Sequence, residues 1–200
     1  MVESGWFYGT FIDPVLQKMR KRIAIEIQTG EKVIDVACGT GAQVFEFSKR
    51  ASNVVGVDLS DSMIAKAQRS KSRGNSKNTS FYVEDATELS RFQDNQFDVA
   101  TMSLALHQFS PELHVKILNE MKRISPKIII VDYAVPLPGN YVGYGSKVAE
   151  FFAGREHHTN FQKYCNLGGL NKILIDNQLS IEKMDFFGRD AFQLVVCIPQ

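Results

Sequence analysis

The sequence predicts an α/β domain with a central parallel β-sheet, and two observations support this. Apolar, strand-like runs alternate with helix-like periods from residue 11 to about residue 133, which is the pattern of repeated strand–helix units. Residues 33–41 read V-I-D-V-A-C-G-T-G, so a buried strand runs directly into a glycine-rich turn, after which a helix begins. The 200 residues, 44% of them apolar, are enough for one domain with a buried core.

This first part of the chain supplies five strands and the helices between them. Each helix is placed by an apolar stripe or a start signal: one carries Ile64 and Ala67 on its apolar face, and another follows Ser110 with Pro111 in its first turn. The run I-I-I-V in the fifth strand suits a strand covered on both faces. The expected order is helix 11–28, strand 33–37, helix 42–50, strand 54–58, helix 61–72, strand 80–83, strand 97–103, helix 111–124 and strand 127–132.

The regular alternation stops after residue 133. Residues 134–178 are aromatic and partly helical, with a Gly168-Gly169 turn ahead of a helix at 170–177. An interruption of this length is too long for an idle connection, so we expect it to form a substrate cap within a single domain spanning residues 1–200. Two β-rich stretches, 179–187 and 191–198, end the chain, and the turn between them predicts an antiparallel hairpin.

The glycine turn and the acids around it have the order and spacing that a nucleoside ligand needs. Gly39 and Gly41 allow backbone N–H groups to approach a ligand at the positive end of the helix dipole. Asp58 ends the second strand, 19 residues after Gly39, where a carboxylate can accept hydrogen bonds from both ribose hydroxyls. Asp35, near the end of the first strand, can meet the positively charged amino group of a methionine tail.

The segment after the third strand predicts contacts with an adenine ring. The Asp85 carboxylate can accept a hydrogen bond from the adenine amino group, and Ala86 offers its backbone N–H. Leu59 and Met63 can enclose the ring from its faces. An acid at a strand end is often only the N-cap of the next helix, but acids at the ends of three consecutive strands favour the ligand.

On these segments the chain resembles the class I S-adenosylmethionine-dependent methyltransferases of small-molecule type, a broad group that includes the ubiquinone/menaquinone-biosynthesis C-methyltransferases. The resemblance rests on the motifs at 33–41, 54–63, 83–86 and 97–107 and covers residues 30–133 well. It implies a three-layer, Rossmann-like fold with a seven-stranded sheet in the order 3-2-1-4-5-7-6, strand 7 being antiparallel. One departure is Ala37, which stands where many members carry a glycine.

The resemblance also implies S-adenosyl-L-methionine as cofactor and S-adenosyl-L-homocysteine as product. The residues expected to bind this cofactor lie on the first strand and its turn, after the second and third strands, and at the end of the fourth. They are Asp35, Ala37, Cys38, Gly39, Thr40, Gly41, Asp58, Leu59, Met63, Asp85, Ala86 and Ser103.

A dinucleotide-binding Rossmann oxidoreductase is the structural rival. Its G-x-G-x-x-G motif, counted from Gly39, requires a third glycine where this chain has Val44. Asp58 suits either cofactor and does not discriminate. Asp35 does, because an acid inside the first strand suits a cationic amino acid tail and would repel a pyrophosphate.

His107 is the residue that we expect to contact the methyl acceptor. It follows the fourth strand, which neighbours the first, so it faces the cofactor across the crevice and is a candidate general base or a loop-capping histidine. Tyr8, Arg155 and His158 are candidates for a substrate lid. His157 and His158 are adjacent and have no Asp or Cys at ligand spacing, so no metal site is predicted.

The composition of the chain and the absence of certain motifs limit which binding partners and which cellular location we predict. A net charge of +1 gives no basic surface for nucleic acid, and the fourth strand is not followed by the D/N-P-P-Y motif of base-amino methylation. The start of the chain does not have the pattern of a signal peptide, and no apolar run approaches about 18 residues, so no membrane insertion is expected. Cys38, Cys165 and Cys197 are far apart without C-x-x-C spacing, which favours reduced thiols in the cytoplasm.

The predicted function is in-line transfer of a methyl group to a small-molecule acceptor, with an oxygen, nitrogen, carbon or sulfur atom as the target. Two other interpretations stay open: a protein- or RNA-directed methyltransferase, and a regulatory protein that binds the cofactor without catalysis. Acceptor pockets in this fold are built from variable segments, so the sequence names neither the acceptor nor the oligomeric state.

Overall fold

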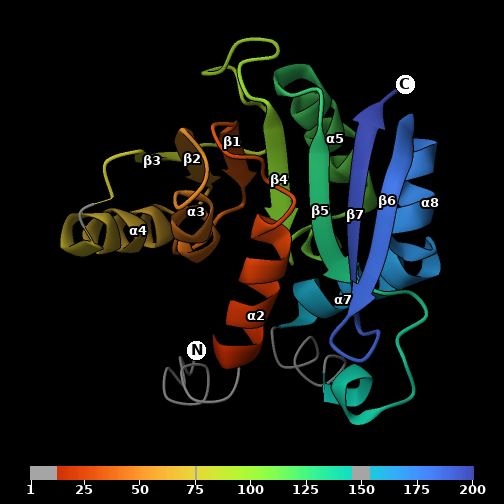
Figure 1. Ribbon diagram of the computed structural model, residues 1–200. Coiled ribbons are helices and arrows are strands. Elements are labelled where there is room, and N and C mark those ends of the chain that lie inside the picture. The colour runs from red at the N-terminus through yellow and green to blue at the C-terminus, as the bar shows by residue number, and fades with distance from the viewer. Residues whose placement is uncertain (1–12, 75, 146–153) are drawn as a thin grey trace.

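A seven-stranded sheet forms the centre of the molecule (Figure 1). The computed structural model describes residues 13–74, 76–145 and 154–200. Strands β1 to β5 pair in parallel, and β7 runs antiparallel to both of its neighbours, β5 and β6, so the other six strands all point the same way. The spatial order is β3-β2-β1-β4-β5-β7-β6, so the predicted order and the reversed seventh strand are confirmed. The strands are β1 (Lys32–Val36), β2 (Asn53–Asp58), β3 (Thr79–Val83), β4 (Val99–Ser103), β5 (Ile128–Tyr133), β6 (Leu179–Phe187) and β7 (Phe192–Pro199).

Helices cover both faces of the sheet, which gives the three predicted layers. In β5 the side chains of Ile128 and Ile130 belong to one core cluster, and those of Ile129 and Val131 to the other. Helices α5 and α8 complete the first cluster, and α2, α3 and α4 complete the second. The helices are α2 (Asp13–Ala24), α3 (Ala42–Phe47), α4 (Asp61–Gly74), η2 (Leu106–Gln108), α5 (Pro111–Ile124), α7 (Arg155–Asn166) and α8 (Gly169–Asp176).

Two predicted helices end earlier than the sequence pattern suggested. The helix expected over 11–28 ends at Ala24, because the next turn tightens: Glu26 and Ile27 donate to carbonyls three residues back. The helix expected over 42–50 ends at Phe47, where Arg50 likewise donates to the carbonyl three residues before it. Residues 11 and 12 lie outside the described part of the chain.

Among the described residues of the predicted cap segment, 134–178, helices α7 and α8 have different surroundings. Helix α8 packs against β5 and β6 and belongs to the helical layer of the fold. Helix α7 contacts η2, the turn that follows β4, and therefore lies at the edge where the parallel strands end (Figure 1). Of the two, α7 is the one placed where a cap would cover a ligand at that edge, and its role as a cap stays a prediction.

The chain ends in the predicted hairpin of β6 and β7. The turn at 188–190 has left-handed backbone at all three residues, which reverses the chain tightly. Within the described ranges, we find no helix with the length and apolar character needed to cross a bilayer.

Candidate cofactor site

The turn after β1 is the centre of the candidate site. Ala37, Gly39 and Gly41 have positive φ angles of 58°, 54° and 77°, so the backbone alternates in and out of the left-handed region. The Cys38 N–H donates to the Val57 carbonyl at 2.9 Å, which anchors this turn to the neighbouring strand β2. Ala37 adopts a left-handed conformation that costs an alanine more free energy than a glycine. The turn therefore forms although it lacks a glycine at this position.

The two glycines of the turn serve different purposes. A Cβ added at Gly39 would meet no atom of the described residues within 4 Å, so the backbone there is open to a ligand. A Cβ added at Gly41 would stand 2.5 Å from the Phe81 ring of β3. Gly41 is therefore required for packing of the α3 N-terminus, whereas Gly39 leaves open space above the turn.

Asp58 closes the site on the β2 side. Its Oδ2 accepts a hydrogen bond from the Gly39 N–H at 2.8 Å, and its Oδ1 accepts one from the Ser60 N–H at 2.9 Å. The acid that is predicted to bind the ribose therefore lies directly beside the glycine turn that is predicted to approach the ligand. A carboxylate can accept about four hydrogen bonds, so two positions on Asp58 suit the hydroxyls of a ribose.

Asp35 lies within strand β1, just before the turn that follows this strand. It is 2% exposed, and Thr101 of β4 donates its hydroxyl to Asp35 Oδ1 at 2.7 Å. Burial raises the pKa of Asp35 to about 7, the Thr101 hydrogen bond opposes that rise, and the negative charge of Asp58 adds to it. Burial, followed by the charges of Asp35 and Asp58, also raises the pKa of the Cys38 thiol. Strand β1 therefore carries a carboxyl that titrates near neutral pH, and the turn that follows carries a thiol that stays protonated and unreactive.

The predicted adenine side carries exposed apolar side chains. Leu59 is 69% exposed directly after β2, and Val83 is 40% exposed at the end of β3, where it pairs in register with Asp58. Met63 is half-buried and Ala86 is buried. The sequence analysis did not single out Val83; its signal is an apolar residue immediately before the Glu-Asp pair.

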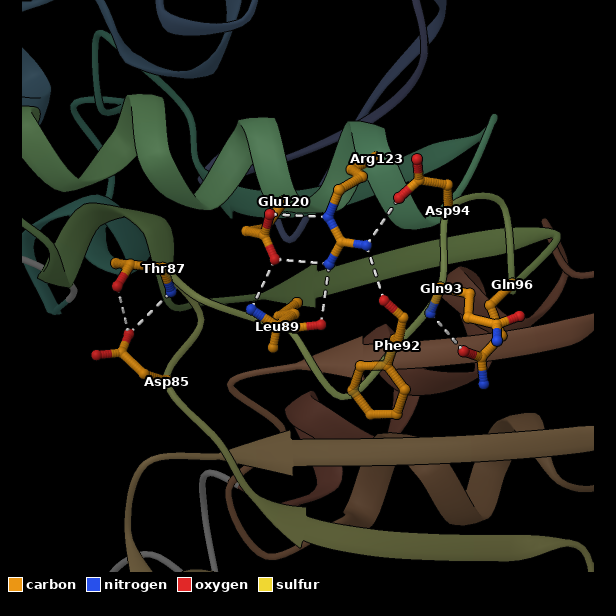
Figure 2. Close-up of polar contacts among 9 residues, drawn as sticks. All are labelled: Asp85, Thr87, Leu89, Phe92, Gln93, Asp94, Gln96, Glu120 and Arg123. Atoms are coloured by element: carbon orange, nitrogen blue, oxygen red, sulfur yellow. Dashed lines mark hydrogen bonds and ion pairs between the residues drawn. The ribbon is translucent and has the colours of Figure 1, made fainter.

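Asp85 stands exposed at the start of the loop that follows β3. Its Oδ1 accepts hydrogen bonds from both the backbone N–H and the hydroxyl of Thr87, each at 2.8 Å (Figure 2). This local turn fixes the direction of the carboxylate. Figure 2 also shows that the following residues of this loop are fastened to α5.

His107 lies beneath α7 and is paired with a residue that the sequence analysis missed. The residue is 1% exposed, and its Nδ1 lies 2.5 Å from Oδ1 of the fully buried Asp132 on β5. The His107 backbone N–H also donates to Asp132 Oδ2 at 3.0 Å. The signal for Asp132 was an acid at the end of an otherwise apolar strand.

Aromatic rings enclose the imidazole of His107. The ring centroids of Tyr133, Phe161 and Tyr164 lie 4.8, 6.0 and 6.3 Å from that of His107. Two of these rings come from α7, so the imidazole is shielded from solvent in this structure. The expected acceptor contact at His107 requires that α7 leave room for a ligand, and it stays a prediction.

The remaining predicted site residues divide between the turn and α7. Ser103 ends β4, and its Oγ is buried without a hydrogen-bond partner among the described residues. A buried hydroxyl of this kind is available to form a hydrogen bond with a ligand. Thr40 is exposed in the turn and Arg155 is exposed in the first turn of α7. His158 lies on α7 with Nε2 2.9 Å from Gln162. Tyr8 lies outside the described residues.

A metal-binding cluster is not found in the described ranges, where no three His, Cys, Asp or Glu side chains are grouped to hold an ion. The backbone at Gly39 is open, and its N–H is bound by the Asp58 carboxylate. The arrangement suits an elongated ligand with a cationic end near Asp35, hydroxyls near Asp58 and a flat ring near Leu59.

Known proteins resemble this chain in sequence and in fold. Residues 33–126 match the family model described as a methyltransferase domain. The demethylmenaquinone methyltransferase of Beutenbergia cavernae is 31% identical over 116 residues, which are 56% of this chain and 45% of the relative. The ubiquinone/menaquinone biosynthesis C-methyltransferase of Idiomarina loihiensis is 32% identical over 133 residues, 61% of this chain and 51% of the relative. The chain thus spans about half the length of the curated relatives it matches.

A solved structure shares the fold over nearly its whole length. The crystal structure of a SAM-dependent methyltransferase from Aquifex aeolicus superimposes with a TM-score of 0.65 and 19% sequence identity, covering 92% of this chain and 89% of that one. At this identity the likeness establishes the architecture of the sheet and its helices.

Proposed function

We propose that this protein binds S-adenosyl-L-methionine at the turn after β1 and transfers its methyl group to a small-molecule acceptor. The match of residues 33–126 to the methyltransferase domain model, the methyltransferase relatives and the shared fold support this proposal. The observation that carries the proposal is the open backbone at Gly39, whose N–H donates to Asp58 Oδ2 at 2.8 Å and which follows the strand that carries the buried Asp35.

The residues present fit this cofactor. Asp58 keeps acceptor positions for two ribose hydroxyls after taking the Gly39 and Ser60 N–H groups. The exposed apolar side chains of Leu59 and Val83 offer surfaces for a flat base. The Ser103 Oγ, which has no hydrogen-bond partner in the part of the chain that the structure describes, stands at the end of β4, where a hydroxyl can bond the tail of the ligand.

When bound, the cofactor supplies a methyl group on a positively charged sulfur, which makes the group ready for displacement and leaves S-adenosyl-L-homocysteine. The residues of the protein then have to align the methyl group with the acceptor and exclude water. Asp35 binds the cationic tail, Asp58 fixes the ribose, and α7 closes the side on which the acceptor enters. His107, held by Asp132, is the group placed to take a proton from an acidic acceptor.

We further propose that the acceptor is small and carries a flat, partly apolar ring. The two relatives take their names from quinone biosynthesis, which supports this class of acceptor. The rings of Tyr133, Phe161 and Tyr164 are buried around His107, so a flat ring that entered beside His107 would pack against aromatic side chains. With a net charge of +1, the chain does not favour a polyanionic acceptor.

The test is a two-step assay on the purified protein. Calorimetry with S-adenosyl-L-homocysteine should detect binding that Gly39→Ala abolishes. Incubation with the cofactor and a panel of quinols, phenols and amines should then release S-adenosyl-L-homocysteine, measured by mass spectrometry. Binding without product from any panel member or cell extract would identify a regulatory protein instead. Methylation confined to protein or RNA fractions would contradict a small acceptor.

A further inference from the structure

The loop between β3 and β4 is fastened to helix α5 by two side chains, Glu120 and Arg123 (Figure 2). This loop begins with Asp85 and Ala86, the residues proposed to meet the adenine base. Neither Glu120 nor Arg123 stands at the strand ends where the cofactor is expected, so both act on the site from a distance.

Arg123 contacts the loop at two main-chain carbonyls. Its Nη2 donates to the Leu89 carbonyl at 2.9 Å, and its Nη1 donates to the Phe92 carbonyl at 2.7 Å. The same Nη1 lies 3.0 Å from Asp94. A planar guanidinium is suited to this work because its N–H groups diverge in one plane and can reach several acceptors at once.

Glu120 holds Arg123 and the loop together. Its carboxylate accepts from Arg123 Nε at 2.9 Å and from Nη2 at 2.8 Å, a two-pronged ion pair. The same carboxylate accepts from the Leu89 N–H at 2.6 Å. The hydrogen bond and charge of Glu120 raise the pKa of Arg123, and those of Arg123 lower the pKa of Glu120. Leu89 therefore has both of its main-chain polar groups bound to α5.

The constraint on Leu89 is transmitted to the proposed adenine contacts through one short turn. The Glu88 N–H donates to the Asp85 carbonyl at 3.0 Å, and Thr87 binds the Asp85 side chain. Three residues separate Asp85 from Leu89, so little backbone freedom remains between them. Farther along the loop, the Asn95 N–H donates to the Arg123 carbonyl at 2.9 Å.

We propose that the Glu120–Arg123 pair positions the base-binding end of the cofactor site, by fixing Leu89 and through it the Asp85 carboxylate and the Ala86 N–H. This inference rests on the proposed function. Glu120 and Arg123 are positioning residues, because neither touches the ligand in the proposed arrangement.

A second ion pair near the loop provides a contrast. Arg91 pairs with Glu84, and its side chain is 51% exposed, whereas the Arg123 side chain is 29% exposed. Exposed pairs contribute little, and Arg91 lies over the Tyr82 ring rather than binding loop carbonyls. The inference therefore concerns Arg123 and not the charge of the loop in general.

The experiment compares two ligands that differ in the base. S-Adenosyl-L-homocysteine carries adenine, and in S-ribosyl-L-homocysteine a hydroxyl replaces the adenine on the ribose. Calorimetry of Arg123→Gln should show affinity for the first ligand weakened about tenfold and affinity for the second within about twofold of wild type. Arg123→Lys, which retains the charge but loses the planar fork, should give an intermediate loss for the adenine ligand alone.

The controls separate this inference from the proposed function and from misfolding. Lys116→Gln removes a cation from an exposed position of the same helix and should leave both affinities unchanged. Equal losses for the two ligands in the folded Arg123→Lys variant, or no loss in either, would overturn the positioning role while leaving the proposed function in place. A wild-type protein that binds neither ligand would overturn the proposed function and the inference together.

Discussion

The backbone N–H of Gly39 donates a hydrogen bond to Asp58 across 2.8 Å, joining the turn after β1 to the end of β2. These residues are 19 positions apart in the chain and were predicted separately, one for backbone approach and the other for ribose hydroxyls. Their bond means that the turn and the acid form one preorganised unit. A change at either residue should therefore alter the binding of ligand more than the fold of the sheet.

Asp58→Ala should weaken binding of S-adenosyl-L-homocysteine by about 1–3 kcal/mol, measured by titration calorimetry. The variant loses the acceptors for the ribose hydroxyls and also releases the Gly39 N–H. Asp61→Ala is the matched control, since it removes an exposed acid three residues away. An affinity for Asp58→Ala equal to that of the control would remove Asp58 from the site.

Alanine at Gly39 should abolish cofactor binding while the protein stays folded. The φ of 54° costs an alanine about 1 kcal/mol, which Ala37 already tolerates at 58°. Gly30→Ala is the control, because Gly30 also has positive φ and open space but precedes β1. Both variants should melt a few degrees below wild type, and Gly39→Ala alone should fail to bind by calorimetry. Retained binding would show that the cofactor does not approach this backbone.

The order of the strands was predicted from the resemblance to a known family, whereas the individual strands and the turn after β1 were predictable from local signals. The apolar run of β5 demanded cover on both faces, and the glycine turn after β1 required a left-handed backbone. The place of Asp58 followed as well, since the carboxyl ends of neighbouring parallel strands meet at one edge.

Pairings between distant segments were not predictable. Asp132 meets His107 because β5 places it beside the turn after β4, and no period in the sequence reports that contact. Arg123 and Glu120 are three residues apart on a helix face and look like an ordinary surface pair. Their role depends on the path of the β3–β4 loop beneath them. The end of α2 at Ala24 was missed because the following tight turns continue a helix-like pattern.

Asp35 should make the unliganded protein less stable as the pH rises. Its pKa in the folded protein is about 7, against an ordinary value of 3.8, so the folded state retains a proton that the unfolded state has lost. This stabilisation is complete below about pH 4 and is lost as the pH rises through 7. Urea unfolding measures the free energy of unfolding at pH 5 and at pH 8. From the lower to the higher pH, this free energy should rise by roughly 2–4 kcal/mol for Asp35→Asn relative to wild type. The same difference in unfolding free energy between variant and wild type at pH 5 and at pH 8 would contradict the raised pKa of Asp35.

Binding of the cofactor should depend on pH in the opposite sense. The cationic tail attracts the ionised form of Asp35, so affinity should fall about tenfold for each pH unit below 7 and level off above it. Calorimetry at pH 6 in buffers of different ionisation enthalpy should detect nearly one proton released on binding. Asp35→Asn should bind more weakly with no such release. A proton count of zero for wild type would separate Asp35 from the ligand.

His107→Ala should lower turnover more than it lowers affinity for S-adenosyl-L-homocysteine. The imidazole is 1% exposed and is held by Asp132 at 2.5 Å, so its loss disturbs packing and removes the proposed proton acceptor. We expect kcat to fall about 10²-fold and the Kd to change less than threefold. His114→Ala is the control, because His114 is as deeply buried and binds the Leu106 and Phe109 carbonyls. A comparable fall in kcat for both variants would assign His107 to the packing of η2 alone, since that result needs no proton transfer.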